Sequence, residues 1–277
     1  MTTKNARSSR DIRIGISGWR YPPWRGVFYP KGLRQRDELS YAASKLNSIE
    51  INGSFYALQR PASYQNWYAD TPEDFVFSVK GPRFITHMKK LADVDVPLAN
   101  FFASGVLGLR EKLGPVLWQL PPTLGFDVDR LTDFFDRLPR STAAASRLAR
   151  KHDARLTGRA LLKTDADRPI RHAMEVRHKS FETDAFAELL RAYDIAVVVA
   201  DTAGKWPMIC QRTAADFVYL RLHGDAELYV SGYSSEKLDD WAKWINAQGC
   251  DGYVYFDNDV KVHAPFDAIA LAERLRR

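Results

Sequence analysis

Eight short runs of β-forming residues, separated by amphipathic segments, are the feature that most limits how this chain can fold. Each run is rich in Val, Ile, Phe or Tyr and is bounded by Gly, Pro or Asp, a pattern typical of strands. The predicted strands are Ile12–Ser17, Ser48–Asn52, Phe75–Lys80, Val116–Leu120, Ala173–Arg177, Ile195–Asp201, Phe217–His223 and Tyr253–Phe256.

Most intervals between these runs carry apolar residues at spacings of three and four, which predicts helices. The predicted helices are Asp37–Asn47, Pro61–Tyr68, Leu98–Leu113, Val128–Leu138, Asp184–Tyr193, Glu236–Gln248 and Pro265–Leu275. Strands that alternate with helices indicate an α/β protein with a parallel sheet covered on both faces. Eight such units in 277 residues favour a single eight-stranded parallel β/α (TIM) barrel.

An open doubly wound sheet is the alternative architecture. That fold usually carries a glycine-rich phosphate loop between its first strand and a helix. Here Ile14–Trp19 contains two glycines, but it leads into Tyr21–Pro23 rather than into a helix N-terminus. The sequence therefore disfavours dinucleotide binding at the first strand.

The segment Arg140–Arg171 is an apparent insertion before the fifth strand, with a possible helix at Ser141–His152. It holds nine basic and three acidic residues, an excess that equals the net charge of +6 for the whole chain. We therefore predict a disordered polar tail at residues 1–10 and one barrel domain at 11–277, with an insertion at about 140–171. The basic segment is the candidate contact for nucleic acid.

Two cysteines are too few for a disulfide framework, and we expect Cys210 and Cys250 to be free thiols in a reducing compartment. The first ten residues lack the apolar stretch of a signal peptide. No stretch approaches the roughly 20 apolar residues that span a membrane. These features predict a cytoplasmic protein with no membrane partner.

Side chains alternate between the two faces of a strand, and this rule separates apolar from polar residues in most of the predicted strands. In the second strand, for example, Ile49 and Ile51 oppose Glu50 and Asn52. The polar face gathers toward the C-terminal end of each strand, which in a β/α barrel forms the active-site mouth. The residues expected to converge there are Glu50, Asn52, Lys80, Gln119, Glu175, Arg177, Arg221 and His223.

A buried salt-bridge network is the structural alternative to a ligand site. It would pair Glu50 with Lys80, and Glu175 with Arg177 or Arg221. Buried charges cost several kcal/mol unless they are paired, and a purely structural network would more naturally lie in the middle of the strands. Placement at the mouth favours ligand binding. Aromatic residues after the first two strands, Trp19 and Tyr56 among them, are candidates for the pocket wall, with packing on the barrel rim as the equal alternative.

Nine motifs, in order along the chain, resemble one known family. They are Ile14–Trp19, Trp24–Pro30, Ile49–Tyr56, Phe77–Lys80, Ile85–His87, Gly114–Pro122, Glu175–His178, Tyr219–Gly224 and Tyr255–Asp259. They resemble the YecE-like family, domain of unknown function seventy-two, from roughly Arg13 to the C-terminus. The resemblance implies a β/α barrel without an established activity, similar in outline to endonuclease IV and the xylose isomerases. It also implies a phosphodiester or sugar-phosphate ligand.

The resemblance also implies a set of polar site positions. They are Glu50, Asn52, Lys80, Gln119, Glu175, Arg177, Arg221, His223 and Asn258. The main departure from the family pattern is Arg140–Arg171, which is shorter in many relatives. The role of that segment therefore does not follow from the resemblance.

We favour an enzyme, a hydrolase, lyase or isomerase, that binds a small substrate carrying phosphate or carboxylate. Lys80, Arg177 and Arg221 would bind the anion, because guanidinium groups grip such oxyanions in bidentate fashion. Glu50 or Glu175 would act as general base, with His223 as the acid. The other predicted binding residues are Asn52, Gln119, Asn258, Trp19 and Tyr56.

Two other functions stay open. A nucleic-acid-binding or endonuclease-IV-like protein would use Arg140–Arg171 against phosphates, and a non-catalytic ligand sensor would use the mouth alone. We predict no cofactor. A divalent metal is the less favoured alternative, because three cations crowd the few candidate ligands. The sequence carries no signal for an oligomeric state.

Overall fold

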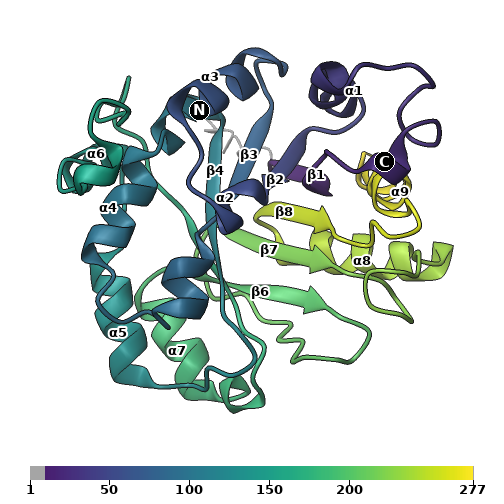
Figure 1. Cartoon of the computed structure of the whole chain (residues 1–277). Coiled ribbons are helices and arrows are strands. Elements are labelled where there is room, and N and C mark those ends of the chain that lie inside the picture. The colour runs from purple at the N-terminus through teal and green to yellow at the C-terminus, as the bar shows by residue number, and fades with distance from the viewer. Residues whose placement is uncertain (1–9, 277) are drawn as a thin grey trace, which may run out of the picture.

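The computed structural model describes residues 10–276, and its eight parallel strands close into a barrel in chain order (Figure 1). Each strand pairs with the next, and β8 pairs with β1. The strands are β1 (Ile12–Ser17), β2 (Ser48–Ile51), β3 (Val76–Lys80), β4 (Leu113–Gln119), β5 (His172–Glu175), β6 (Ala196–Asp201), β7 (Phe217–Leu222) and β8 (Asp251–Phe256). The predicted barrel is confirmed, and the open-sheet alternative is wrong.

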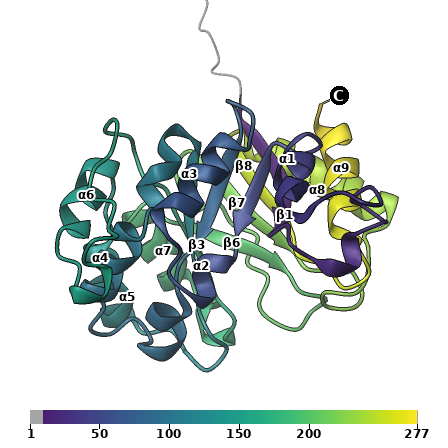
Figure 2. The ribbon, with the colours of Figure 1, turned by 45° about the horizontal axis from the view of Figure 1, so that its top comes forward.

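Helices surround the strands on the outside of the barrel (Figure 2). They are α1 (Glu38–Ala43), α2 (Gly53–Tyr56), α3 (Pro61–Ala69), α4 (Asp95–Ala103), α5 (Val128–Arg137), α6 (Thr142–Ala149), α7 (Asp184–Ala192), α8 (Ser235–Gln248) and α9 (Ala264–Leu275). Several begin where a side chain accepts a backbone N–H of the first turn, as Asp127 does for α5 and Thr183 does for α7. Local sequence therefore sets these helix starts.

The predicted helix Leu98–Leu113 is wrong in its extent. The chain forms α4 and then a separate 3-10 segment, Val106–Lys112, and the two are divided at Gly105. Gly105 has a φ of 123°, and a Cβ there would lie 2.6 Å from Cα of Pro61 in α3. Only glycine accommodates both the backbone conformation and this close approach.

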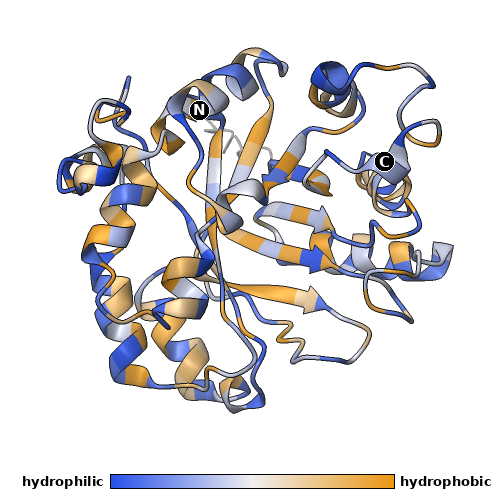
Figure 3. Cartoon of the chain, in the orientation of Figure 1, coloured by the Kyte–Doolittle hydropathy of each residue, from blue (hydrophilic) through white to orange (hydrophobic). Residues whose placement is uncertain are grey.

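The core has two layers, as strand parity predicts. Outward-facing strand residues such as Ile49 and Trp118 join the helices in the larger cluster, while Leu117, Tyr219 and Tyr255 fill the barrel interior. Figure 3 shows this pattern as largely apolar strands inside helices with one apolar and one polar side. The polar inward residues lie above the interior layer, toward the strand ends.

The segment 140–171 leaves the barrel after α5 and carries α6, which packs on α4 in the outer layer. The predicted helix Ser141–His152 is confirmed in a shorter form, with Ser141 capping its start.

The connection from β6 to β7 has no helix (Figure 1). The polar tail predicted for residues 1–10 lies outside the described residues except for Arg10. Within residues 10–276 no helix is long and apolar enough to cross a membrane.

Candidate functional site at the barrel mouth

Arg221 is the centre of a charged cluster at the C-terminal end of the barrel. Its side chain, on β7, is fully buried. Its Nη2 donates to Oε1 of Glu50 and to Oδ2 of Asp257, each at 2.9 Å, and its Nη1 donates to Oε2 of Glu175 at 2.8 Å. Although burial opposes it, these three carboxylates hold the pKa of Arg221 well above its ordinary value. Arg221 is therefore neutralised by the protein itself.

The carboxylate oxygens of Glu50 and Glu175 also accept hydrogen bonds from neighbouring side chains of the protein. Glu50 accepts bonds from Tyr219 at 2.6 Å and from Ser17 at 3.1 Å, besides those from Arg221. On Glu175, Oε1 accepts from Nε2 of Gln119 at 2.8 Å and from Nε of Arg177 at 2.9 Å. Burial raises the pKa of Glu175, but Arg221 and Arg177 outweigh it and hold that pKa well below its usual range.

His223 lies behind this cluster and is also fully buried. Its Nδ1 is 3.1 Å from Oδ2 of Asp257, although the two are not aligned for a good hydrogen bond. Its Nε2 is 3.5 Å from Nη1 of Arg221, which can only donate. We therefore assign the ring proton to Nδ1, facing the carboxylate, with Nε2 as the acceptor.

The other two cations, Lys80 and Arg177, keep some exposure at the mouth. The Lys80 side chain forms no ion pair with any described residue, and its Nζ lies 4.3 Å from the centre of the Phe55 ring. Arg177 donates Nε to Glu175 and stacks its guanidinium 3.9 Å over the ring of Trp206. No acceptor among residues 10–276 bonds its terminal nitrogens. These two side chains thus offer N–H groups to a ligand.

The pKa of Lys80 is lowered to about 8, mainly by burial and then by the positive charge of Arg221. The negative charges of Glu50, Glu175 and Asp257 oppose this shift without cancelling it. The carboxylates nearby are held by arginines, so they do not compensate the lysine in full. Lys80 consequently carries a proton that it can lose near neutral pH.

Two aspartates after β8 add acid and base groups at the same end of the barrel. Burial raises the pKa of Asp257, but Arg221 and His223 outweigh it, and the net shift is downward. For Asp259, burial and then the charge of Asp257 raise the pKa to about 6. One carboxylate thus stays ionised while its neighbour titrates near neutrality, a division typical of acid–base sites.

The predicted site residues do not include several that lie at the mouth, among them Asp257, His87 and Trp206. Asp257 comes directly after the eighth strand, at the inward spacing of two from Tyr255, so strand parity places it at the same end of the barrel. The ring of His87 lies 5.1 Å from that of Phe55, which Lys80 also contacts, and burial and then Lys80 and Arg177 lower its pKa to about 4. His87 lies in a short π-helical segment and Trp206 in an irregular connection, so no strand or α-helical pattern marks the direction of either side chain.

Three predicted binding residues lie together beside the cluster. Trp19, Asn52 and Tyr56 line one cavity of about 250 Å³, which Tyr21 and Trp67 also border. Oδ1 of Asn52 is buried there without a hydrogen-bond partner among the described residues. The cavity therefore combines aromatic walls with an unused amide acceptor, as a ligand pocket does.

Gln119 and Asn258 have partners within the protein. Gln119 is buried and holds Glu175, as described above. Asn258 is fully buried and donates Nδ2 to the backbone oxygen of Ser231 at 2.9 Å and to Asp267 at 2.8 Å. The structure thus places Asn258 where it ties the loop after β7 to α9, away from the cations.

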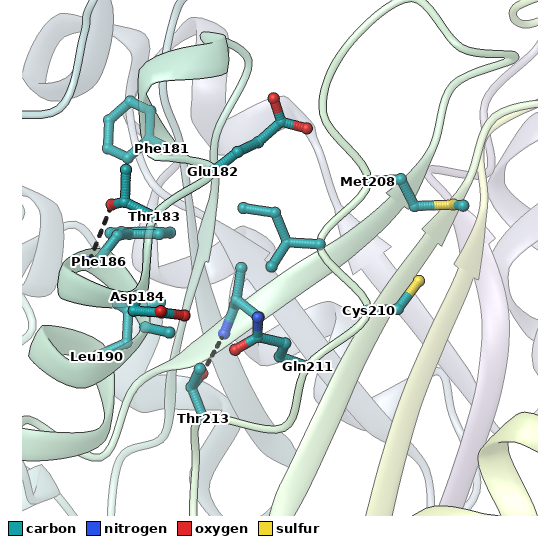
Figure 4. A pocket seen from close by; sticks show the side chains of 13 residues that line it. Phe181, Glu182, Thr183, Asp184, Phe186, Leu190, Met208, Cys210, Gln211 and Thr213 are labelled. Carbon is teal, nitrogen blue, oxygen red and sulfur yellow. Dashed lines mark hydrogen bonds between the residues drawn. The ribbon is translucent and has the colours of Figure 1, made fainter.

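A cavity of about 470 Å³ lies away from the mouth. It lies between α7 and the extended segment before β7, and its lining includes Met208, Cys210 and Gln211 (Figure 4). It exists because no helix follows β6 to cover the outer face of that strand. Only Glu182 and Asp184 are charged in its lining, so it has no set of converging acids and bases. We place the candidate site at the mouth for this reason.

The basic segment does not join the cluster. Three of its nine cations are paired with acids, as Arg155 is with Asp153 and Arg168 is with Asp165. Arg171 is the third, with Asp216 and Asp251. Contact of this segment with nucleic acid stays a prediction.

Both cysteines are free, Cys210 exposed and Cys250 buried. In the described part of the chain, no group of three or more His, Cys, Asp or Glu residues could hold a metal ion.

Comparison with known proteins identifies the family of this chain. The family model described as "Protein of unknown function DUF72" matches residues 13–277. UPF0759 protein YunF of Bacillus subtilis is 26% identical over 279 residues, covering 90% of this chain and 89% of the relative. UPF0759 protein YecE of Escherichia coli is 32% identical over 129 residues. That match spans 46% of this chain and less than half, 44%, of the relative.

Solved structures show the same fold. A DUF72 family protein from Thermotoga maritima has a TM-score of 0.77 and 25% identity, covering 97% of this chain and all of the other. A DUF72 family protein from Enterococcus faecalis has a TM-score of 0.74 and 18% identity, covering 96% of each chain. The names of these proteins state no activity.

Proposed function

Because the chain belongs to the DUF72 family of proteins of unknown function, we propose from its own residues that it is an enzyme for a small anionic substrate. The substrate carries a phosphate or carboxylate group and binds at the barrel mouth. Arg177 and Lys80 hold that group, and a carboxylate beside them transfers a proton. A hydrolase, lyase or isomerase would all fit this arrangement.

The single observation that carries the proposal is the free end of Arg177. Its Nε is fixed by Glu175 and its plane by Trp206, so the guanidinium is ordered before any ligand arrives. Its terminal N–H groups have no acceptor within residues 10–276. These donors are pre-oriented and open toward the mouth, and a bidentate oxyanion would satisfy them with charge-assisted hydrogen bonds. Lys80 supplies the second positive charge of the same site.

Attraction at this mouth acts at short range. Arg221, Arg177 and Lys80 carry three positive charges, and Glu50, Glu175 and Asp257 carry three negative ones, to which Asp259 adds a fourth above about pH 6. The mouth thus has no excess of positive charge, and it attracts an anion through the N–H groups that face outward. Affinity for a small anion should therefore fall only modestly with salt, unlike binding to a nucleic acid, which depends steeply on salt.

Asp259 and Asp257 are the proton-transfer groups that the geometry favours. Both lie at the mouth, and their pKa values are driven apart, that of Asp259 upward to about 6 and that of Asp257 downward. Proton transfer by Glu50, Glu175 or His223 stays a prediction. All three are completely buried, and the two glutamates are fully hydrogen-bonded, which favours a positioning role in which Glu50 and Glu175 fix Arg221 and Glu175 also fixes Arg177.

Calorimetric titration with inorganic phosphate and with succinate tests the proposal. We expect saturable binding of at least one of the two, with one site per chain. Arg177→Gln should weaken that binding, because it removes the free donors and leaves Glu175 bonded to Arg221 and Gln119. Arg150→Gln, an exposed position in the basic segment, is the matched control and should bind as the wild type does. Equal loss in both variants, or no binding by the wild type, would reject the proposal.

A further inference from the structure

Lys80 differs from Arg177 and Arg221, the other cations of the cluster, because it has no carboxylate partner. Arg221 and Arg177 donate to carboxylates, whereas the Lys80 ammonium has no ion-pair partner in the described part of the chain. Its one defined neighbour is the face of Phe55, 4.3 Å away. The side chain is 7% exposed, so water solvates it only in part. A lone ammonium that is this poorly compensated is suited to chemistry rather than to support.

The surroundings favour loss of its proton. Burial and the neighbouring Arg221 lower the pKa of Lys80 to about 8. An amine with such a pKa is a nucleophile in a useful fraction of molecules at neutral pH, which is how enzymes activate lysine for attack on a carbonyl group. His87 lies nearby, and burial and the adjacent cations lower its pKa to about 4. Its ring is therefore neutral at pH 7 and adds no competing charge.

The backbone also positions Lys80 for attack. It is the last residue of β3, on the inward face, and its carbonyl oxygen accepts a 2.6 Å bond from Ser54. This bond joins the end of β3 to α2, the helix that carries Phe55. The amine is thus held at a fixed depth in the mouth, and the charges of Lys80 and Arg177 both reach the ring of His87.

We propose that Lys80 forms a Schiff base with a carbonyl substrate whose anionic group is held by Arg177, such as a 2-oxo acid or a phosphorylated ketone. The inference rests on the proposed anion site and names the substrate class for it. The lysine nitrogen attacks the carbonyl carbon, and a C–N bond forms. The carbonyl oxygen then leaves as water with two hydrogens from the ammonium. The product is a protonated imine, so atoms and charge balance without an outside oxidant or reductant.

A protonated imine withdraws electrons from the adjacent carbon. It therefore assists either removal of a proton from that carbon or cleavage of a carbon–carbon bond to it. Asp257 and Asp259 are the carboxylates available at the mouth for such proton transfer. Of the three reaction classes above, this chemistry favours a lyase or an isomerase over a hydrolase.

Borohydride trapping tests the inference directly. The protein is incubated with pyruvate or with dihydroxyacetone phosphate, reduced with sodium borohydride, and examined by intact mass and by peptide mapping. We expect a single adduct per chain, on Lys80, that requires both the carbonyl compound and the reductant. Peptide mapping of the wild type locates the adduct without relying on a variant that has to fold.

Two variants give matched controls. Lys80→Arg keeps the positive charge and removes the amine, so it should lose the adduct. Lys205→Arg alters an exposed lysine whose Nζ lies 4.9 Å from the Trp206 ring at the same mouth, and it should label as the wild type does.

The failures are distinguishable. Calorimetric binding of pyruvate or phosphate without a Lys80 adduct overturns the Schiff base and leaves the anion site standing. Adducts spread over exposed lysines and unchanged in Lys80→Arg also overturn it. Absence of binding by phosphate and by both carbonyl compounds rejects the anion site and the Schiff base together.

Discussion

Arg221 and Arg171 lie at opposite ends of the same barrel, and each is surrounded by acidic side chains. Arg171, just before β5, contacts Asp216 and Asp251 and donates to the hydroxyl of Tyr253 at 2.9 Å. The side chain of Asp216 is 57% exposed and that of Asp251 is 27% exposed. The Arg221 side chain and its two glutamates are fully buried.

The difference separates ion pairs that only join neighbouring strands, those of Arg171, from a charged cluster at a candidate site, that of Arg221. At the N-terminal end, water solvates the acids, so the ion pairs cost little desolvation free energy and contribute little to stability. At the C-terminal end, the same types of group are removed from water at a cost of several kcal/mol per charge. A barrel that needed only a core would place apolar residues there. The buried charges at the mouth therefore point to selection for function at that end.

The largest effect we expect comes from removing the two arginines in turn. Arg221→Leu leaves three carboxylates without their central cation and should lower the free energy of unfolding by about 3–5 kcal/mol. Arg171→Leu, the matched change at the other end, should lower it by about 1 kcal/mol. Urea denaturation of both variants measures the difference. Equal losses would remove the distinction between the two ends.

A smaller effect concerns Asp259 and depends on pH. Its pKa in the folded protein is raised to about 6 from an ordinary value of 3.8, so the folded state binds this proton more tightly than the unfolded state. The resulting stabilisation is present below pH 4 and is lost as pH rises toward 6. Because Asp259 is partly exposed and solvent screens its charge, Asp259→Asn should gain about 1–2 kcal/mol of unfolding free energy relative to the wild type between pH 4 and pH 6.5.

Asp153 provides a control of opposite sign. Its hydrogen bonds with Arg155 lower its pKa to about 2, so its contribution is present above pH 4 and is lost as pH falls toward 2. Asp153→Asn should therefore differ from the wild type most at neutral pH and least in acid. Thermal unfolding across the pH range follows both variants. If the Asp259→Asn difference stays constant with pH, the raised pKa is wrong.

The smallest expected effect on stability accompanies the clearest effect on binding. Arg177→Gln should weaken phosphate or succinate binding about tenfold, or about 1.4 kcal/mol, through loss of charge-assisted hydrogen bonds. Its free energy of unfolding should change by less than that of Arg221→Leu, because Glu175 keeps Arg221 and Gln119 as partners. Calorimetry and urea denaturation on the same preparation give both quantities. A large loss of stability with unchanged binding would assign Arg177 to the structural network.

Strand parity explains why much of the mouth was predictable. Alternation fixes which strand side chains point inward, so the sequence alone places Glu50, Lys80, Glu175 and Arg221 at one end of the barrel. Alternation gives the direction of each side chain but not the residue with which it pairs. The pairing of Glu50 with Lys80 was wrong, since Glu50 contacts Arg221. Glu175 was predicted to pair with Arg177 or Arg221, and it pairs with both.

The features that the strand pattern does not describe lie where the chain leaves the strands. Asn258 follows β8 and turns toward Ser231 and Asp267, which a strand pattern does not encode. His87 lies in a short π-helical segment, Phe84–Met88, whose spacing matches neither strand nor α-helix. The sequence pattern also does not indicate how deeply each charged side chain is buried. The pattern identified charged residues at the mouth but not that Arg221 is enclosed while Arg177 keeps free donors.

The most direct test of the account is a crystal of the protein soaked in sulfate or phosphate. We predict one tetrahedral anion at the mouth, within hydrogen-bonding distance of the terminal nitrogens of Arg177 and of Nζ of Lys80. Arg221 should keep its bonds to Glu50, Glu175 and Asp257. An anion found only on the basic segment Arg140–Arg171, or a mouth that stays empty at saturating anion, would contradict the account.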